Sequence, residues 1–226
     1  MSDIEILAYH GWGFDARCWN NWEMLMPDSI DWKSMDRGYF REPRSPEFSA
    51  STPTKIVFTH SFGLHQCSDE VTQKADILVI FSGFLRFHPT AAQFRRRSKQ
   101  VVNQMIRQFQ DEPLKVLKVF YRNVYHPQKT FELPREIRDT SLLLEDLKKL
   151  NTRERSLPSV KENANIFIFH GTDDAIVPKR KGRGLFDKFG NKAQYFEIQN
   201  SGHALPMTHA EKCWQMIQPE ILHPVQ

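Results

Sequence analysis

The chain has 226 residues, with 31 Lys or Arg, 27 Asp or Glu and a formal net charge of +4, which suits one substantial domain with its own core. No stretch approaches the ~20 apolar residues of a membrane-spanning helix, and "MSDIEILAYH" at the start has no basic region followed by an apolar one, so we expect neither a membrane span nor a secretory signal. Three scattered cysteines without metal-ligand spacing, Cys18, Cys67 and Cys213, predict reduced thiols in a cytoplasmic protein.

Apolar runs that end in glycine or polar residues predict the strands. They are "IEILAYH" (4–10), "TKIVFTH" (54–60), "ADILVIF" (75–81), "NANIFIFH" (163–170) and "AQYFEI" (193–198), with "SIDWKSMD" (29–36) as a weaker candidate. Near-continuous apolar runs are typical of parallel strands that are buried on both faces. Helix-compatible segments at 68–74, 180–190 and 209–222 lie between or after them. This alternation predicts an open α/β sheet flanked by helices.

A basic segment between residues 84 and 157 has a different pattern. It holds 16 Lys or Arg against 8 Asp or Glu, a net of +8, whereas the rest of the chain sums to −4. Its apolar residues recur at helical spacing, and Thr90 and Pro113 are expected to start the first two helices. We therefore predict a helical cap at 84–157, inserted into a core made of 1–83 and 158–226. The predicted cap helices lie at 89–110, 112–125 and 133–150.

Chemically capable residues follow four of the predicted strands, at the sheet edge where open parallel sheets bind ligands. They are Gly11-Trp12-Gly13, Ser61, Asp173-Asp174 and Ser201-Gly202-His203. Serine, acid and histidine in this chain order match the α/β-hydrolase triad. In such a triad His203 takes the hydroxyl proton of Ser61, and a buried carboxylate holds the imidazole in the required tautomer. Either Asp173 or Asp174 can be that carboxylate.

The stretch "THSFG" at 59–63 predicts a nucleophile elbow, the sharp strand-to-helix turn G-x-S-x-G, except that Thr59 replaces the first glycine. We expect a wider strand–helix crossing, or a smaller residue opposite, behind Ser61. His60 and His65 are close in sequence to this serine. A triad base approaches from a separate loop, so His203 remains the preferred base.

An oxyanion hole needs two backbone N–H groups that point at the developing negative charge. One is expected from Phe62, the residue after the serine. The other is expected from Trp12, in the loop after the first strand, where the flanking glycines allow the backbone to approach the substrate closely.

Stretches from nearly the whole chain resemble the α/β-hydrolase superfamily, and within it the pimeloyl-acyl-carrier-protein methyl ester esterases of biotin synthesis. The resemblance rests on "HGWGFDARCW" (10–19), Ser61 with Phe62-Gly63, "LLLEDLKKLNTRERSLPSV" (142–160), "DAIVP" (174–178) and "SGHALPMTHAEKC" (201–213). It implies an α/β-hydrolase fold whose sheet has about six mostly parallel strands, because the usual N-terminal antiparallel strands are missing. It favours Asp174 over Asp173, since the hydrolase carboxylate is typically followed by two residues and Val-Pro.

The resemblance also implies a function: a serine carboxylesterase that hydrolyses the methyl ester of a pimeloyl chain on acyl carrier protein. Trp12, Phe120 and Tyr121 would contact the acyl chain, and no metal or organic cofactor is implied. Acyl carrier protein is acidic, so the cationic cap is a candidate docking face. The candidate docking residues are Arg95, Arg96, Arg97, Lys99, Arg107, Lys115, Lys118 and Arg122.

Two other functions fit the same residues. One is a general small-ester hydrolase whose basic cap has no partner, and the other is a hydrolase-fold binding protein with an inactive elbow. Nucleic-acid binding is disfavoured, because the basic run "RRRSK" at 95–99 lacks the interleaved aromatic residues of a base-stacking surface.

Overall fold

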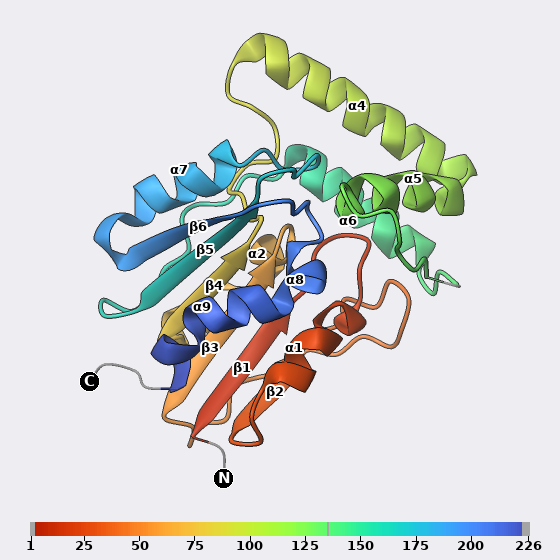
Figure 1. Cartoon of the computed structure of the whole chain (residues 1–226). Helices are drawn as coiled ribbons and strands as arrows, with labels where there is room; N and C mark the ends of the chain where they lie inside the picture. The colour runs from red at the N-terminus through yellow and green to blue at the C-terminus, as the bar shows by residue number, and fades with distance from the viewer. Residues whose placement is uncertain (1–2, 135, 223–226) are drawn as a thin grey trace.

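The centre of the computed structural model, which describes residues 3–134 and 136–222, is a six-stranded sheet (Figure 1). Its strand order is β2-β1-β3-β4-β5-β6, and each neighbouring pair of strands is parallel. All six are stretches that the sequence predicts, including the weaker candidate, so the expected open parallel sheet is confirmed. The strands are β1 (Ile4–Tyr9), β2 (Ile30–Ser34), β3 (Thr54–His60), β4 (Ile77–Phe81), β5 (Asn165–Gly171) and β6 (Ala193–Ile198).

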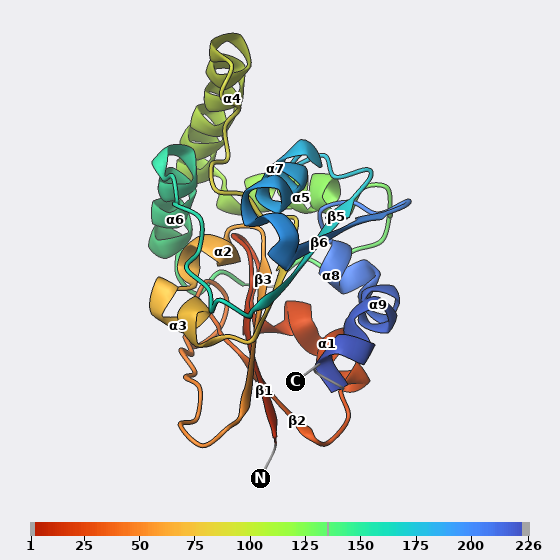
Figure 2. The ribbon, with the colours of Figure 1, turned by 90° about the vertical axis from the view of Figure 1, so that its left-hand side faces the viewer.

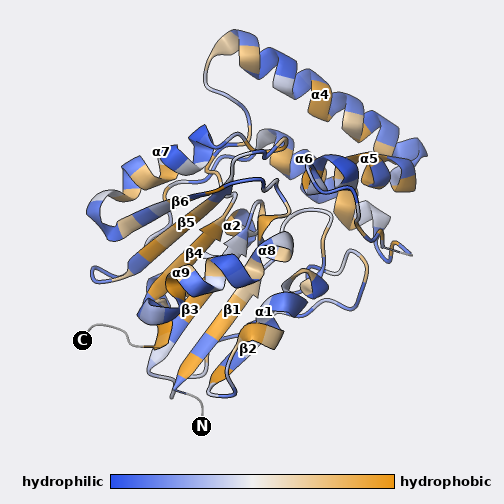
Figure 3. Cartoon of the chain, viewed as in Figure 1, coloured by the Kyte–Doolittle hydropathy of each residue, from blue (hydrophilic) through white to orange (hydrophobic). Residues whose placement is uncertain are grey.

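Helices cover both faces of this sheet, which explains why its central strands are apolar throughout (Figures 2 and 3). Ile56 and Phe58 of β3 pack into one layer, and Val57 packs into the other. The first layer contains the 3₁₀ turn η1 (Ala16–Trp19), α1 (Asn20–Leu25), α8 (Leu205–Thr208) and α9 (Ala210–Leu222). The second contains α2 (Gly63–Gln66), α3 (Asp69–Lys74) and α7 (Arg180–Phe189), with the 3₁₀ turn η2 (Gly190–Lys192) after α7. No helix within the described ranges is long and apolar enough to cross a membrane.

Three helices leave the sheet after β4 and return before β5. They are α4 (Ala92–Asp111), α5 (Pro113–Tyr125) and α6 (Thr140–Thr152), and Pro113 starts α5 as expected. Apolar residues of all three helices form one cluster with Trp12. In Figures 1 and 2, α4 stands out from the rest of the molecule, and only Val102 and Phe109 of its described side chains are buried.

Two helix starts in the cap differ from the sequence prediction. α4 begins after Ala91, which makes no side-chain capping bond, and Thr90 lies one residue too early. The third helix begins at Thr140 rather than near 133, because Asp139 caps it by accepting the N–H of Leu142 at 2.8 Å. The N–H groups of Arg138 and Asp139 donate to the Tyr39 carbonyl, a tertiary contact that holds the preceding chain out of the helix.

A buried carboxylate ties α6 to the loop after β2. Asp146 accepts hydrogen bonds from Arg37 Nε at 2.7 Å, the Tyr39 hydroxyl at 2.7 Å and Lys149 Nζ at 3.1 Å. Burial alone would raise the pKa of Asp146, but these donors hold it below its usual value. Loss of its donors would leave this buried carboxylate without partners, so the contact anchors the cap to the core.

The three cysteines are free and buried, as the sequence predicts. Burial raises the pKa of Cys67 and of Cys213 to about 12. Both thiols are therefore protonated at neutral pH and behave as small apolar groups.

The turn after β3 passes very close to the backbone of β1. Ser61 has φ +55°, in the left-handed region that non-glycine residues rarely adopt. A Cβ on Gly63 would lie 2.3 Å from the carbonyl oxygen of Tyr9, so glycine is required there. Thr59 is fully buried, and its hydroxyl lies 3.4 Å from the Val79 carbonyl. The tightest approach thus falls at Gly63, and the wider crossing expected at Thr59 stays a prediction.

We predict that Gly63→Ala lowers the free energy of unfolding by roughly 2–4 kcal/mol, because the added methyl must displace backbone atoms of β1. Gly184→Ala, inside α7, is the matched control, since its Cβ meets nothing within 4 Å. That change should raise the free energy of unfolding by about 0.5–1 kcal/mol through helix propensity. Urea unfolding followed by tryptophan fluorescence measures both, and equal effects of the two substitutions would contradict the tight crossing.

Candidate active site

Ser61, His203 and Asp174 form one hydrogen-bonded chain at the carboxyl edge of the sheet. The three residues follow β3, β6 and β5, and parallel strands bring their carboxyl ends to the same edge. The Ser61 hydroxyl lies 2.9 Å from His203 Nε2, and His203 Nδ1 lies 2.8 Å from Asp174 Oδ2. With Nδ1 protonated, Nε2 is free to accept the serine proton, which is the arrangement that activates a hydroxyl as a nucleophile.

Asp174, and not its neighbour, provides the carboxylate of this chain. Its side chain is fully buried, and Oδ1 accepts the backbone N–H groups of Ile176 at 2.9 Å and Val177 at 2.8 Å. Asp173 is exposed and accepts the Thr172 hydroxyl at 3.1 Å. The geometry therefore separates two adjacent acids that the residues alone leave as alternatives.

A second histidine supports the carboxylate, although the sequence analysis does not single it out. His170 is fully buried at the end of β5; its Nε2 lies 2.7 Å from the Val177 carbonyl and 3.4 Å from Asp174 Oδ2. Burial alone would raise the pKa of Asp174, but the charge of His203 and the hydrogen bonds from both histidines hold it well below its usual value. The signal that could have identified His170 is the "HG" pair, which follows β1 directly and ends β5.

The two histidines near the elbow are engaged elsewhere. His60 Nε2 donates to the backbone carbonyl of His203 at 2.9 Å, and His65 Nε2 donates to the Phe84 carbonyl at 2.9 Å. Burial lowers the pKa of His60 well below its ordinary value and that of His65 to about 4, so both rings are neutral at pH 7. Neither bonds to the serine hydroxyl, and His60 instead fixes the loop that carries His203.

The loop after β1 approaches the serine closely enough to supply an oxyanion donor. A Cβ on Gly11 would lie 3.1 Å from the Cβ of Ser61, so a larger residue would crowd the turn. Within residues 3–134 and 136–222, no acceptor takes the backbone N–H of Trp12 or of Phe62. Both N–H groups are therefore free to donate to a ligand, and their role as the oxyanion hole stays a prediction.

Cap residues hold this loop in place. The Tyr121 hydroxyl donates to the Gly13 carbonyl at 2.7 Å, and the Trp12 indole N–H donates to the Leu143 carbonyl at 2.8 Å. Tyr121 is buried in the core and does not line the cavity above the serine, in contrast to its expected contact with substrate. Phe120, the residue before it, does line that cavity.

A cavity of about 720 Å³ opens above Ser61 and His203. Helices α4 and α5 form much of its wall, and Trp12 and Phe120 contribute aromatic surface beside the serine. The wall is mostly apolar, which suits a ligand with a hydrocarbon portion. Its other apolar residues include Phe87, Phe94, Val101, Val102, Met105, Val116, Val119, Leu147, Leu150 and Ile176.

The eight cap cations that the sequence analysis selects are all exposed on α4 and α5. Arg97 and Lys115 line the cavity, and the others lie outside its wall. The Arg95 guanidinium donates to the Thr90 carbonyl, and Lys115 pairs with Glu112 at 2.9 Å. Exposed pairs of this kind contribute little to stability.

Comparison with solved structures shows the same architecture in several enzymes. The esterase EaEST from Exiguobacterium antarcticum superposes with a TM-score of 0.77 at 13% identity, covering 98% of this chain and 92% of the other. A hydrolase from Oleispira antarctica has a TM-score of 0.77 at 16% identity, covering 97% of this chain and 91% of the other. A thermophilic esterase from Thermogutta terrifontis has a TM-score of 0.72 at 15% identity, covering 96% of this chain and 89% of the other. No protein-family model and no curated protein sequence matches the chain. The six parallel strands, the flanking helices and the inserted α4–α6 are those of the α/β-hydrolase fold.

Proposed function

We propose that this protein is a serine hydrolase of carboxylic esters. The observation that carries the proposal is the hydrogen-bonded chain from Ser61 through His203 to Asp174, which lies at the floor of an apolar cavity. The likeness of the fold to solved esterases is consistent with this chemistry, although function depends on the site and not on the fold.

Acylation begins when Ser61 Oγ attacks the ester carbonyl and His203 Nε2 takes the hydroxyl proton. The C–O bond that forms places negative charge on the former carbonyl oxygen, and the backbone N–H groups of Trp12 and Phe62 stabilise that charge. Asp174 stabilises the imidazolium through Nδ1. His203 then returns the proton to the alcohol oxygen as the ester C–O bond breaks, which leaves an acyl-enzyme on Ser61.

Deacylation repeats these steps with water in place of the serine. His203 takes a proton from the water as its oxygen attacks the acyl carbonyl, and the oxyanion again accepts hydrogen bonds from the same two N–H groups. Collapse of the intermediate breaks the bond to Ser61 Oγ, which recovers its proton from His203 and releases the carboxylic acid.

The more specific substrate that we propose is the methyl ester of a pimeloyl chain carried on acyl carrier protein. Three features support it: the sequence stretches that resemble the esterases of biotin synthesis, the apolar cavity, and the exposed cations of α4 and α5. An acidic carrier protein would be steered to such a cationic face and present its acyl chain to the cavity.

A general carboxylesterase that acts on small free esters is the second candidate. The solved structures of similar fold favour it, because two of those compared are described simply as esterases. This candidate uses the same three residues and the same cavity, and it assigns no partner to the cap. The two candidates differ in whether activity depends on the charge of α4.

Ser61→Ala should abolish hydrolysis of p-nitrophenyl butyrate, with a loss on the order of 10⁴–10⁶ in kcat, because it removes the hydroxyl that bonds to His203 Nε2. The variant should also fail to react with a fluorophosphonate, and mass spectrometry should locate the label of the unmodified protein on Ser61. Labelling of a different residue, or turnover that survives the substitution, would refute the assignment.

Asp174→Asn should reduce kcat by on the order of 10³–10⁴, because the amide no longer holds the His203 tautomer with Nε2 free. Asp173→Asn is the matched control and should leave kcat within about twofold, since that side chain is exposed and outside the hydrogen-bonded chain. Steady-state kinetics of both variants decide between the two acids, and a larger loss in Asp173→Asn would reverse our assignment.

The carrier-bound substrate predicts a dependence on cap charge. Arg96 and Arg107 lie eleven residues, about three turns, apart on one face of α4. Changing both to Glu would therefore make this face repel an acidic carrier protein. KM for the carrier-bound methyl ester should rise roughly tenfold and lose much of its salt dependence. Lys188→Glu on α7 changes the charge away from the cap and serves as control.

The unmodified protein should also restore growth of a biotin-requiring strain that lacks its own esterase. Failure to restore growth, when the protein is expressed and folded, excludes this substrate.

A further inference from the structure

One part of the cavity wall carries two arginines without a carboxylate partner. Arg97 of α4 and Arg180, the first residue of α7, both line the cavity. A third cation of the wall, Lys115, is neutralised by Glu112, which also lines the cavity and lies 2.9 Å away. In the part of the chain that the structure describes, neither arginine forms an ion pair or a side-chain hydrogen bond. The wall therefore has an uncompensated double positive charge.

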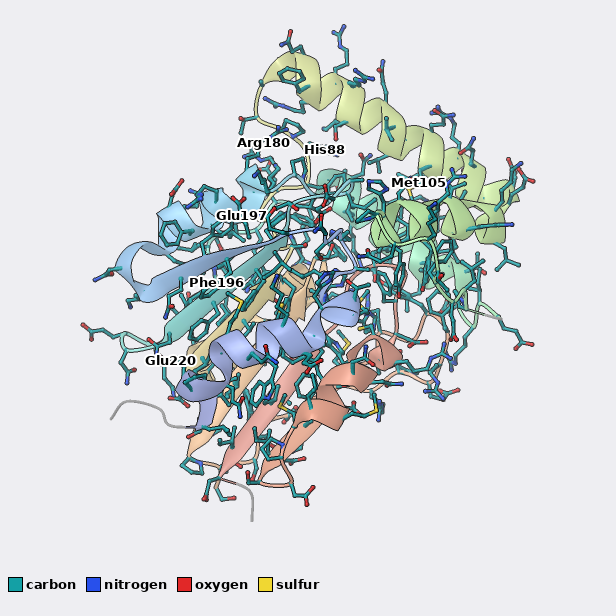
Figure 4. All side chains as sticks on the ribbon, in the orientation of Figure 1. His88, Met105, Arg180, Phe196, Glu197 and Glu220 are labelled. Atoms are coloured by element: carbon teal, nitrogen blue, oxygen red, sulfur yellow. The ribbon has the colours of Figure 1, made fainter. Side chains whose placement is uncertain are left out.

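Hydrogen bonds through His88 link the residues next to these two arginines. His88 Nδ1 lies 2.8 Å from the hydroxyl of Ser98, the neighbour of Arg97. The carbonyl of His88 accepts Lys181 Nζ, next to Arg180, at 2.9 Å. Figure 4 shows Arg180 and His88 close to one another below the start of α4. The first turn of α7 and the first half of α4 are thus both anchored to the loop that precedes α4, and Phe87 and Pro89 of this loop also line the cavity.

The charges around this end are unbalanced. Burial, together with the positive charges of Arg180 and Arg86, lowers the pKa of Lys181 to about 8, so cations here repel one another. Glu154 is the carboxylate that acts in the opposite direction on Lys181, and it is paired with Arg86 at 2.5 Å. An anion that enters this end of the cavity would relieve that repulsion.

We propose that Arg97 and Arg180 form a subsite for an oxyanion, a carboxylate or a phosphate, at the far end of an ester whose scissile bond lies at Ser61. The subsite deepens the proposed ester hydrolysis and depends on it. A guanidinium binds either oxyanion through two parallel N–H donors, and two such groups fit the three acceptor oxygens of a phosphate or the two of a carboxylate. Most of the other residues that line the cavity are apolar, so a methylene chain would connect the subsite to the serine. The substrate class is thus an ester of an acyl chain with an anionic end, such as a dicarboxylic acid half-ester.

The experiment compares esters that have the same chain but differ in charge. Methyl heptanoate is the neutral probe, methyl hydrogen pimelate carries a carboxylate at the far end, and methyl 7-phosphonoheptanoate carries a phosphonate. The unmodified protein should show a kcat/KM for at least one of the anionic esters roughly tenfold above that for the neutral ester, mainly through KM. This advantage should shrink at high salt, because both arginines are exposed.

Substitutions then assign the advantage to the two arginines. Arg97→Gln and Arg180→Gln should each reduce the ratio of anionic to neutral kcat/KM about threefold, and the double variant should bring it near one. Lys188→Gln, an exposed cation of α7 that does not line the cavity, is the control and should keep the ratio. A preference for the carboxylate or for the phosphonate identifies which anion the subsite binds, and either supports it.

The outcomes separate this inference from the proposed function. If methyl heptanoate is hydrolysed but neither anionic ester is preferred, the subsite is wrong and ester hydrolysis stands. A preference that survives in the double variant likewise refutes the assignment to these arginines. If no ester is hydrolysed and Ser61 does not react with a fluorophosphonate, the proposed function fails and the subsite fails with it.

Discussion

Close backbone packing behind the serine is the constraint on which the site depends. Gly63 touches the carbonyl of Tyr9, and this contact holds the turn in which Ser61 keeps a left-handed conformation that costs about 1–2 kcal/mol. The histidine loop is held in the same way, since a Cβ on Gly202 would lie 1.7 Å from the carbonyl oxygen of His126. The nucleophile and the base therefore occupy rigid turns, and little reorganisation is needed when a proton moves between them.

The cap is part of this arrangement and does not simply cover it. Tyr121 and Leu143, from two different cap helices, hold the loop that carries the Trp12 N–H, and Asp146 anchors α6 to the loop after β2. A displacement of α5 or α6 would therefore move an oxyanion donor as well as the wall of the cavity. Substrate that contacts α5 can in this way influence the geometry around the reacting carbonyl.

The sequence predicts the strands and the order of the reacting residues because both are local patterns: apolar runs, and polar residues at strand ends. It does not predict where α6 begins, since that depends on the distant Tyr39 carbonyl. Nor does it place Tyr121, because a helical stripe of apolar residues does not show which members face a cavity and which face the core. Nor does it show that His170 bonds to the Val177 carbonyl in the loop after β5, or that Arg180 shares a cavity wall with residues of α4.

The sparse packing of α4 has a consequence for how a ligand reaches the serine. A helix of twenty residues with two buried side chains gains little from the hydrophobic effect, so its amides should exchange with solvent through local openings that leave the sheet intact. Such openings separate the wall of the cavity from its floor, where the turns are held by backbone contacts. The molecule thus combines an entrance of low local stability with a rigid reaction centre, and entry of a long acyl chain need not disturb the alignment of the three reacting residues.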